Sequence, residues 1–241
     1  MGVIQYAVLS MVLLLLGAGG ASMLVQSSRK KRLLDLLSFS GAYLFGILVM
    51  ELLPAIFHDG NHTAGVLFLV GFFVQLGMDF WTRGIEHGHL HIPAPDQKLT
   101  IITLFAGLGV HALMDGLPFA GIHSAVMESN HTIYSGILLH KIAEGFTLLL
   151  VMDMMGYKLI RSWIYILCFS LITPLSIVVI QYMPILLDHV PVVLGFAGGS
   201  LLHVSITILF ESENLHHHGI PVRKLISIGM GLLLSILIAL G

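Results

Sequence analysis

Two short motifs place a histidine and a carboxylate four residues apart within apolar stretches of the chain. The first motif is HALMDG, with His111 and Asp115, and the second is HKIAEG, with His140 and Glu144. Residues four apart lie on the same face of an α-helix, one turn from each other. An ionisable group in the middle of a bilayer costs several kcal/mol, so each of these side chains is a functional hypothesis by default.

If the two helix faces meet, two imidazole nitrogens and two carboxylate oxygens converge on one point. This ligand set suits zinc, ferrous iron or manganese, and it lacks the thiolates expected for copper(I). The alternative is that the four side chains bond to one another and to backbone carbonyls between packed helices. The repetition of the pattern in two otherwise apolar stretches favours a metal site.

Two neighbouring residues affect the expected site. Lys141 follows His140 and points about 100° further around the helix, where its ammonium either neutralises Asp115 or extends to the membrane surface. The first arrangement leaves a site for a single metal ion. Pro118 removes a helical hydrogen bond and frees a carbonyl group near Met114, which either helps to dehydrate a cation or marks a packing kink.

Other ionisable side chains lie in further apolar stretches. Glu51, followed by the letters LLP, is either an entrance ligand together with His58 and His62 or part of a solvated helix end. His203 is either an additional metal ligand or an interior histidine whose hydrogen bonds are satisfied within the protein.

The composition is that of a membrane protein. Of 241 residues, 56% are hydrophobic and 10% are charged, whereas about a quarter of residues are charged in soluble domains. The formal net charge of −2 gives no support for a nucleic-acid partner. The single cysteine, Cys168, excludes a site with several cysteine ligands. We therefore expect the lipid bilayer to surround the chain and histidine to carry any metal chemistry.

The chain divides into eight apolar runs of the length that a bilayer requires, roughly 20 residues each. We expect spans at Val3–Val25, Leu33–Phe57, Ala64–Trp81, Leu99–Ile122, Thr132–Asp153, Leu159–Met183, Val190–Phe210 and Leu225–Leu240. The first run follows no basic segment, so it is interpreted as a span and not as a cleavable signal peptide. The predicted fold is an all-α bundle of eight transmembrane helices in one domain, 1–241, with a histidine-containing cytoplasmic loop at 83–98.

Basic residues predict the orientation of this bundle. Ten of the eleven lysines and arginines lie in the first, third, fifth and seventh connections or, like Arg161, within three residues of one, and the eleventh, Lys141, lies within the fifth span. Basic residues are retained on the cytoplasmic side, so both termini are expected outside the cytoplasm.

Internal similarity suggests an inverted repeat. The letters FSGAYLFG begin at Phe39 in the second span, and FAGGSLLH begins at Phe196 in the seventh, which runs in the opposite direction. The paired histidine motifs also lie in antiparallel spans, as an inverted repeat requires.

These residues resemble the ZIP family of zinc and iron transporters over nearly the whole chain. The resemblance is carried by HALMDG in the fourth span, HKIAEG in the fifth and GAYLFGILVMELLP in the second. It implies an eight-span bundle with both termini outside the cytoplasm. It also implies that the transport-site ligands are His111, Asp115, His140 and Glu144.

Three positions depart from the family pattern. Ala112 stands where many members have a ligating asparagine, and Lys141 stands where several have an acidic residue. Both changes argue against a site for two metal ions. Glu51 occupies a place where relatives often have histidine, which keeps a ligand there but favours harder cations.

The resemblance implies uptake of zinc toward the cytoplasm by alternating access, with iron, manganese or cadmium as further cargo, and it implies no enzyme activity. The expected location is the plasma or inner membrane of the cell, and the sequence leaves a homodimer open. Glycines such as Gly46, Gly145 and Gly199 are expected to let helix groups slide past each other. Two histidine clusters, EHGHLH at 86–91 and HHH at 216–218, either sense or release metal or belong to flexible polar segments.

Two other functions fit the same side chains. An intramembrane metal-dependent hydrolase would also place histidines and acids on facing helices, but the chain has no His-Glu-x-x-His pattern. A proton-coupled carrier of a small solute would use the histidines and carboxylates as a proton relay. Solute flux should persist in a chelator, whereas metal transport requires free metal.

Overall fold

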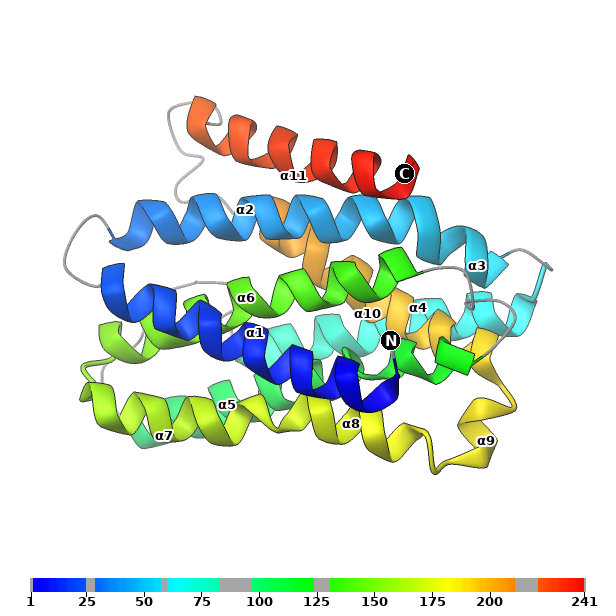
Figure 1. Ribbon diagram of the computed structural model, residues 1–241, viewed down its shortest axis with the longest axis horizontal. Coiled ribbons are helices and arrows are strands. Elements are labelled where there is room, and N and C mark those ends of the chain that lie inside the picture. Colours follow the sequence, from blue (N-terminus) through cyan, green and yellow to red (C-terminus); the bar gives the residue numbers. More distant parts are fainter. Residues whose placement is uncertain are drawn as a thin grey trace.

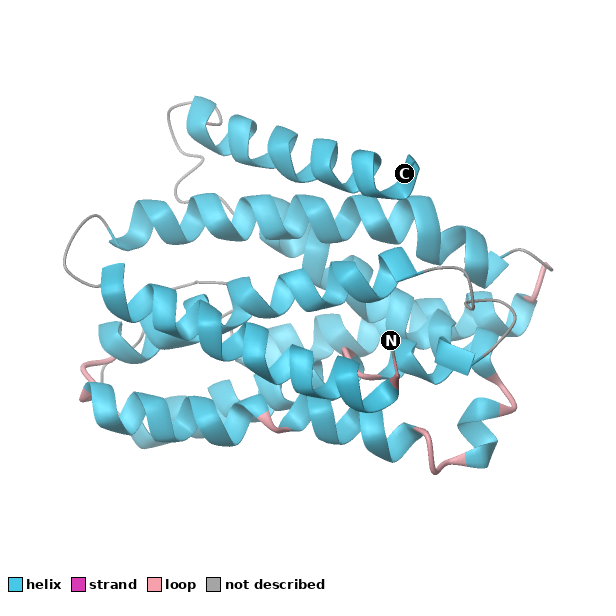
Figure 2. Ribbon diagram, in the orientation of Figure 1, coloured by secondary structure: helices cyan, strands magenta, loops and turns pink. Residues whose placement is uncertain are grey.

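The computed structural model describes residues 2–24, 29–57, 60–82, 97–123, 131–210 and 221–240, and the regular structure in these ranges is helical (Figure 2). The helices are α1 (Val3–Leu24), α2 (Arg29–Ile47), η1 (Leu48–Leu52), α3 (Leu53–Phe57), α4 (His62–Thr82), α5 (Gln97–Met114), η3 (Leu117–His123), α6 (His131–Met154), α7 (Leu159–Ser170), α8 (Ile172–Ile180), α9 (Pro184–Leu187), α10 (Val190–Phe210) and α11 (Val222–Leu240). Both predicted histidine clusters, at 86–91 and 216–218, lie outside the described residues.

Within the described ranges, eight segments are long and apolar enough to cross a membrane, from Val3–Met23 to Val222–Leu240. Their ends differ from the predicted ones by no more than three residues. The prediction of an all-α bundle with eight spans is confirmed. Both termini lie at the same end of the bundle, on the right in Figure 1, as an even number of spans requires. Their location outside the cytoplasm stays a prediction.

Three spans are interrupted, each four residues before a proline, and of these interruptions only the one before Pro118 was predicted. The second span contains the π-helical turn η1, the fourth changes from α5 to the 3₁₀ helix η3, and the sixth breaks between α7 and α8. A proline has no N–H group and its ring clashes with the carbonyl four residues earlier. The prolines are Pro54, Pro118 and Pro174, and the corresponding carbonyls belong to Met50, Met114 and Ser170.

The helices form two groups. In the first helix group, α1 packs against α6, α7 and α8, and α8 packs against α5, which η3 continues. In the second helix group, α10 packs against α4 and α2, and α2 packs against α11; η1 and α3 continue α2. The groups meet mainly where α6 lies against α2 and where η3 lies against α10. Figure 1 shows α11 and α2 along one edge, α7 and α8 along the other, and α6 between them.

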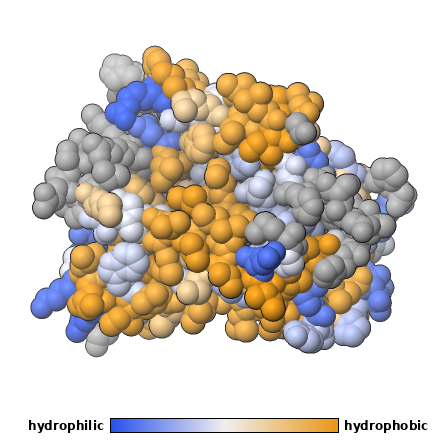
Figure 3. Space-filling view, in the orientation of Figure 1, coloured by the Kyte–Doolittle hydropathy of each residue, from blue (hydrophilic) through white to orange (hydrophobic). Residues whose placement is uncertain are grey.

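Burial follows this arrangement. In the fifth span, which α6 forms, 83% of the most apolar window is buried, against 17% in the third span and 11% in the eighth. The outer helices carry exposed large side chains such as Phe73, Phe80 and Leu175. Apolar residues cover much of the face in Figure 3. Since lipid is as apolar as these side chains, the surface suits a bilayer, and α6 is the helix best shielded from it.

Glycines hold the helices together within each group. A Cβ atom at Gly17 of α1 would lie 2.0 Å from the carbonyl oxygen of Ile142 in α6, and one at Gly145 of α6 would lie 2.0 Å from that of Leu14 in α1. Gly199 makes the same close approach to α4 from α10. Small residues allow helix backbones to touch in this way. The closest glycine contacts therefore join helices of one group, where we had expected them between groups that slide.

Replacing Gly17 by alanine should destabilise the protein, because the added methyl group meets a backbone oxygen that cannot move without shifting α6. Overpacking of this kind costs about 1–3 kcal/mol or more. Thermal unfolding of the purified protein in detergent measures the loss. The control is Gly19→Ala in the same helix, where an added Cβ has no neighbour within 4 Å. Equal melting temperatures for the two variants would contradict the close packing of α1 on α6.

Candidate metal centre

The paired motifs lie at the middle of the bundle. His111 is in the last turn of α5, and Asp115 follows in the turn that leads to η3. The Asp115 N–H group still donates to the His111 carbonyl oxygen at 3.0 Å, so the two side chains remain one helical turn apart. His140 and Glu144 lie one turn apart in the central part of α6. All four residues are buried, with exposed fractions of 6% or less.

The end of α5 is anchored by α8. Where the helix stops, the Ala112 carbonyl accepts a hydrogen bond from Thr173 Oγ1 at 2.9 Å, and the Leu113 carbonyl accepts one from Ser176 Oγ at 2.7 Å. Carbonyls at a helix end have no partner in their own helix, and inside a membrane they need one from a neighbour. Pro118 thus ends the helix next to Asp115, and hydroxyl groups of α8 fix the turn that carries this carboxylate.

Three of the four predicted ligands come together. One ligand atom from each of His111, Asp115 and His140 lies within 4.8 Å of the other two. His111 Nε2 and Asp115 Oδ2 are 3.5 Å apart, and the two imidazole rings are nearly perpendicular, with centroids 5.7 Å apart. Two atoms that both bind zinc at about 2.1 Å with tetrahedral geometry are about 3.4 Å apart. The His111–Asp115 spacing fits that requirement.

Lys141 lies between Asp115 and Glu144 and forms an ion pair with each of them. Its side chain is fully buried, and Nζ donates to Asp115 Oδ2 and to Glu144 Oε2, both at 2.5 Å. Of the two arrangements expected for this lysine, the structure shows the one at Asp115, with Glu144 as a second partner. The ammonium compensates much of the negative charge of two carboxylates that water cannot reach.

The same side chains keep atoms that are free to bind a ligand. Asp115 Oδ1 and Glu144 Oε1 are buried and have no hydrogen-bond partner among the described protein atoms, and the same holds for Nδ1, the second ring nitrogen of His111. A buried polar atom without a partner is costly and rare in folded proteins. Each carboxylate thus keeps one oxygen that Lys141 does not contact and that a ligand can bind.

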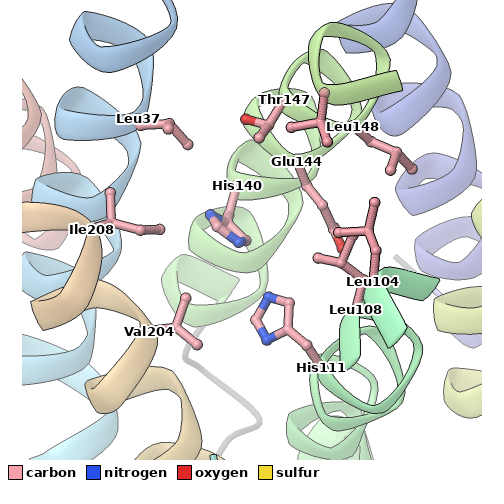
Figure 4. A pocket seen from close by; sticks show the side chains of 11 residues that line it. Leu37, Leu104, Leu108, His111, His140, Glu144, Thr147, Leu148, Val204 and Ile208 are labelled. Carbon is pink, nitrogen blue, oxygen red and sulfur yellow. The ribbon is translucent and has the colours of Figure 1, made fainter. Parts of the chain in front are cut away.

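A small cavity adjoins these atoms, with a volume of about 30 Å³, which is enough for one or two water-sized ligands. His111, His140 and Glu144 line one side of it, and their side chains converge in Figure 4. The remaining lining is mostly apolar and consists of Leu37, Leu104, Leu108, Thr147, Leu148, Val151, Val204 and Ile208. Residues of α5 and α6 thus face residues of α2 and α10 across the boundary between the two helix groups.

Two other predicted ligands lie elsewhere. Glu51 is in η1 and is half-buried, and it is not among the residues that line the cavity. His203 is buried in α10, with Nε2 at 3.5 Å from Asp79 Oδ2 of α4 and at 3.4 Å from Thr207 Oγ1. The structure therefore brings neither residue to the cavity, and a ligand role for each stays a prediction. His62 is exposed at the start of α4, and His58 lies outside the described residues.

The sequence analysis missed two polar contacts. Asp79, the partner of His203, is an ionisable residue inside an apolar run, and the rule that singled out the other intramembrane acids applies to it equally. Ser40 Oγ lies 3.1 Å from His140 Nδ1. No sequence signal marks that serine, because the contact joins residues 100 positions apart.

Comparison with protein families gives one result for this chain. The family model described as ZIP zinc transporter matches residues 82–241, which include both histidine motifs and five of the eight spans. A search of curated proteins finds no significant match.

Replacing Lys141 by methionine should leave Asp115 and Glu144 without their counter-charge. Removing one partner of a buried ion pair costs about 3–5 kcal/mol, so the melting temperature in chelator should fall. Added zinc should restore more stability to the variant than to the intact protein, because the metal replaces the missing positive charge. The control is Lys158→Met, at an exposed position before α7. A variant that melts like the intact protein in chelator would contradict the role of Lys141.

Proposed function

Because the chain belongs to the ZIP zinc transporter family, we propose that it carries zinc across a membrane through the site formed by His111, Asp115, His140 and Glu144. Family membership and the eight apolar helices establish an integral membrane protein and support transport of a divalent metal ion. The observation that carries the proposal for this site is the buried cluster of His111, Asp115 and His140, together with a cavity that His111, His140 and Glu144 line and one partnerless oxygen on each of Asp115 and Glu144.

The donor set favours zinc. Two imidazoles and two carboxylates offer nitrogen and oxygen ligands at the number that tetrahedral zinc takes. Ferrous iron, manganese and cadmium accept the same ligands, so they are expected competitors. Glu144 lines the cavity, and it joins the other three ligands through Oε1, while Oε2 stays on Lys141.

The charges favour one ion. Asp115, Glu144 and Lys141 together carry a formal charge of −1, and one divalent ion changes this to +1. A second divalent ion would raise the charge to +3 in a buried site with a mostly apolar surround, which is strongly unfavourable. Lys141 thus takes the place of a second cation, in agreement with the departure from the family pattern at that position.

The position of the cavity suggests how the ion reaches one side of the membrane. Leu37 and Leu104 lie near the starts of α2 and α5, and Val151 and Ile208 lie near the ends of α6 and α10. These helix ends all adjoin the first, third, fifth and seventh connections, which carry the basic residues. With the orientation that these residues predict, the cavity extends from the site toward the cytoplasm.

The opposite half of the group boundary consists of apolar side chains, which line a smaller cavity of about 10 Å³. Ile47 and Leu48 of the second group share one buried cluster with Ile133 and Ile137 of the first, and each is 2% exposed or less. A cation with its hydration shell does not pass such a constriction. These features support an inward-facing form as part of the proposal, and separation of the apolar side chains in the opposite half would then give the outward-facing form.

Alternating access then requires the two helix groups to move relative to each other. All four proposed ligands belong to the first group, and the cavity separates them from α2 and α10 of the second. The glycine contacts hold each group together, while the boundary between them consists largely of apolar side chains. Movement along this boundary would expose the same ligands first to one side and then to the other.

Two further ligand roles extend the proposal. Glu51 lies in η1, in the half of the second span opposite to Leu37, where it would meet ions that enter from outside. The histidines at 86–91 and 216–218 would receive ions on the cytoplasmic side. Neither role is needed for binding at the central site.

The two rival functions give different results in chelator. ZIP proteins are transporters and not enzymes, and a hydrolase would in addition have to position a metal-bound water against a peptide or lipid substrate. A proton-coupled solute carrier would work without metal. Solute flux that persists in chelator would favour the proton relay, and hydrolysis that disappears in chelator would favour the enzyme.

Zinc uptake into proteoliposomes tests the proposal. The intact protein should give saturable uptake, and His111→Ala and Glu144→Ala should each lower it by at least about tenfold, since even loss of a group that only supports a ligand costs 10–100-fold. His189→Ala is the matched control, because His189 is exposed and its ring contacts only the carbonyl of Ile185 among the described hydrogen bonds.

Competition by iron, manganese and cadmium in the same assay ranks the metals. The proposal is wrong if the intact protein moves no zinc. It is also wrong if both site variants transport as fast as the His189 control.

A further inference from the structure

Ser40 makes an unusual contact for a serine in a helix. Helical serines commonly donate to a carbonyl one turn earlier in their own helix, as the hydroxyls of Ser10, Ser205 and Ser235 do here. The Ser40 hydroxyl, which is 2% exposed, instead lies 3.1 Å from Nδ1 of His140 in α6. A buried hydroxyl of the second helix group thus contacts a proposed metal ligand of the first group.

This contact occupies Nδ1 of His140 and leaves Nε2 as the ring nitrogen that can bind the ion. A neutral imidazole carries its proton on one nitrogen and a lone pair on the other. With the proton on Nδ1, the ring donates to Ser40 Oγ and presents the Nε2 lone pair to the site. Metal-binding histidines typically donate their second nitrogen in this way, which fixes the ring and raises the basicity of the ligating atom.

The twin motif lacks the equivalent support. His111 Nδ1 is buried and has no hydrogen-bond partner, whereas His140 Nδ1 has Ser40. The two histidines therefore differ in environment, although HALMDG and HKIAEG are alike in sequence. The His140 ring thus has a hydrogen-bond partner on its Nδ1 side, and the His111 ring has none there among the described protein atoms.

The contact also crosses the boundary between the helix groups. Ser40 is in α2 and His140 is in α6, on opposite sides of the interface along which we expect movement. A ligand that takes part of its orientation from the other group has that support only in conformations that keep the two helices in register. The affinity for the ion then depends on the position of the groups, as a carrier requires for binding and release.

On the basis of the proposed function, we propose that Ser40 is a positioning residue that orients His140 Nε2 toward the transported ion and makes its affinity depend on the relative position of the two helix groups. The hydroxyl does not touch the ion. It acts through the imidazole, so its loss should weaken binding without removing a ligand.

Cobalt(II) binding to the purified protein tests this role, because the visible absorption of bound cobalt reports ligand geometry as well as affinity. Ser40→Ala removes the hydroxyl and adds no atoms. Ser40→Thr and Ser40→Val form a matched pair of similar shape, of which only threonine has a hydroxyl. Ser205→Ala is the control for loss of a buried hydroxyl that bonds within its own helix, beside the cavity residue Val204. Thermal unfolding in chelator verifies that each variant is folded.

We expect Ser40→Ala and Ser40→Val to weaken cobalt binding about 10–100-fold and to change the absorption spectrum. Ser40→Thr and Ser205→Ala should behave like the intact protein. In zinc uptake, the two variants that lack the hydroxyl should show a raised KM of the same order with a maximal rate close to that of the intact protein, because all four ligands remain.

Three results would overturn the role of Ser40: unchanged affinity in Ser40→Ala and Ser40→Val, equal losses in the threonine and valine variants, or an equal loss in Ser205→Ala. Each of them leaves the proposed function intact if the intact protein binds and transports metal. An intact protein that neither binds cobalt nor moves zinc would overturn the proposed function and, with it, this inference.

Discussion

The ion pairs of Lys141 with Asp115 and Glu144 are the interactions on which the rest of the structure depends. Two carboxylates in the middle of a bilayer are tolerable only with a compensating charge, and the lysine supplies it at 2.5 Å from each. The pairs join the end of α5 to the centre of α6 and leave one oxygen of each carboxylate without a partner. This arrangement compensates the buried charge without a metal and leaves one oxygen of each carboxylate for the single ion that we propose.

The surrounding helices make this arrangement rigid on one side and movable on the other. Pro118 ends α5 beside Asp115. Hydroxyl groups of α8 donate to the carbonyls of Ala112 and Leu113 at this helix end, so the turn has a fixed geometry. Gly17 and Gly145 allow the backbones of α1 and α6 to pack in direct contact. On the opposite side, the site faces a cavity and the apolar side chains of α2 and α10, with Ser40 as a polar contact across the boundary. The contrast suits a binding unit that moves as one body against a second.

Much of this architecture could be predicted from the sequence because its signals are local. Runs of about 20 apolar residues predicted the eight spans, and the four-residue spacing of His111–Asp115 and His140–Glu144 identified four side chains, of which His111, Asp115 and His140 come together. Contacts between distant positions gave no such signal. Three contacts depend on how the helices are rotated and paired. They are the ion pair of Lys141 with Asp115, the pairing of His203 with Asp79 and the contact of Ser40 with His140. The glycines were recognised as contact residues, but only the packing shows that they join helices of the same group.

The zinc K-edge X-ray absorption spectrum of the zinc-loaded protein tests the central claim most directly. The account predicts one zinc per chain, bound by imidazole nitrogens and carboxylate oxygens at about 2.0–2.2 Å, with no sulfur at about 2.3 Å and no second metal at about 3.5–4 Å. The histidine contribution should fall in His111→Ala. A spectrum with sulfur ligands or a neighbouring metal ion, or one that the His111 substitution leaves unchanged, would contradict a single ion held between the two histidine motifs.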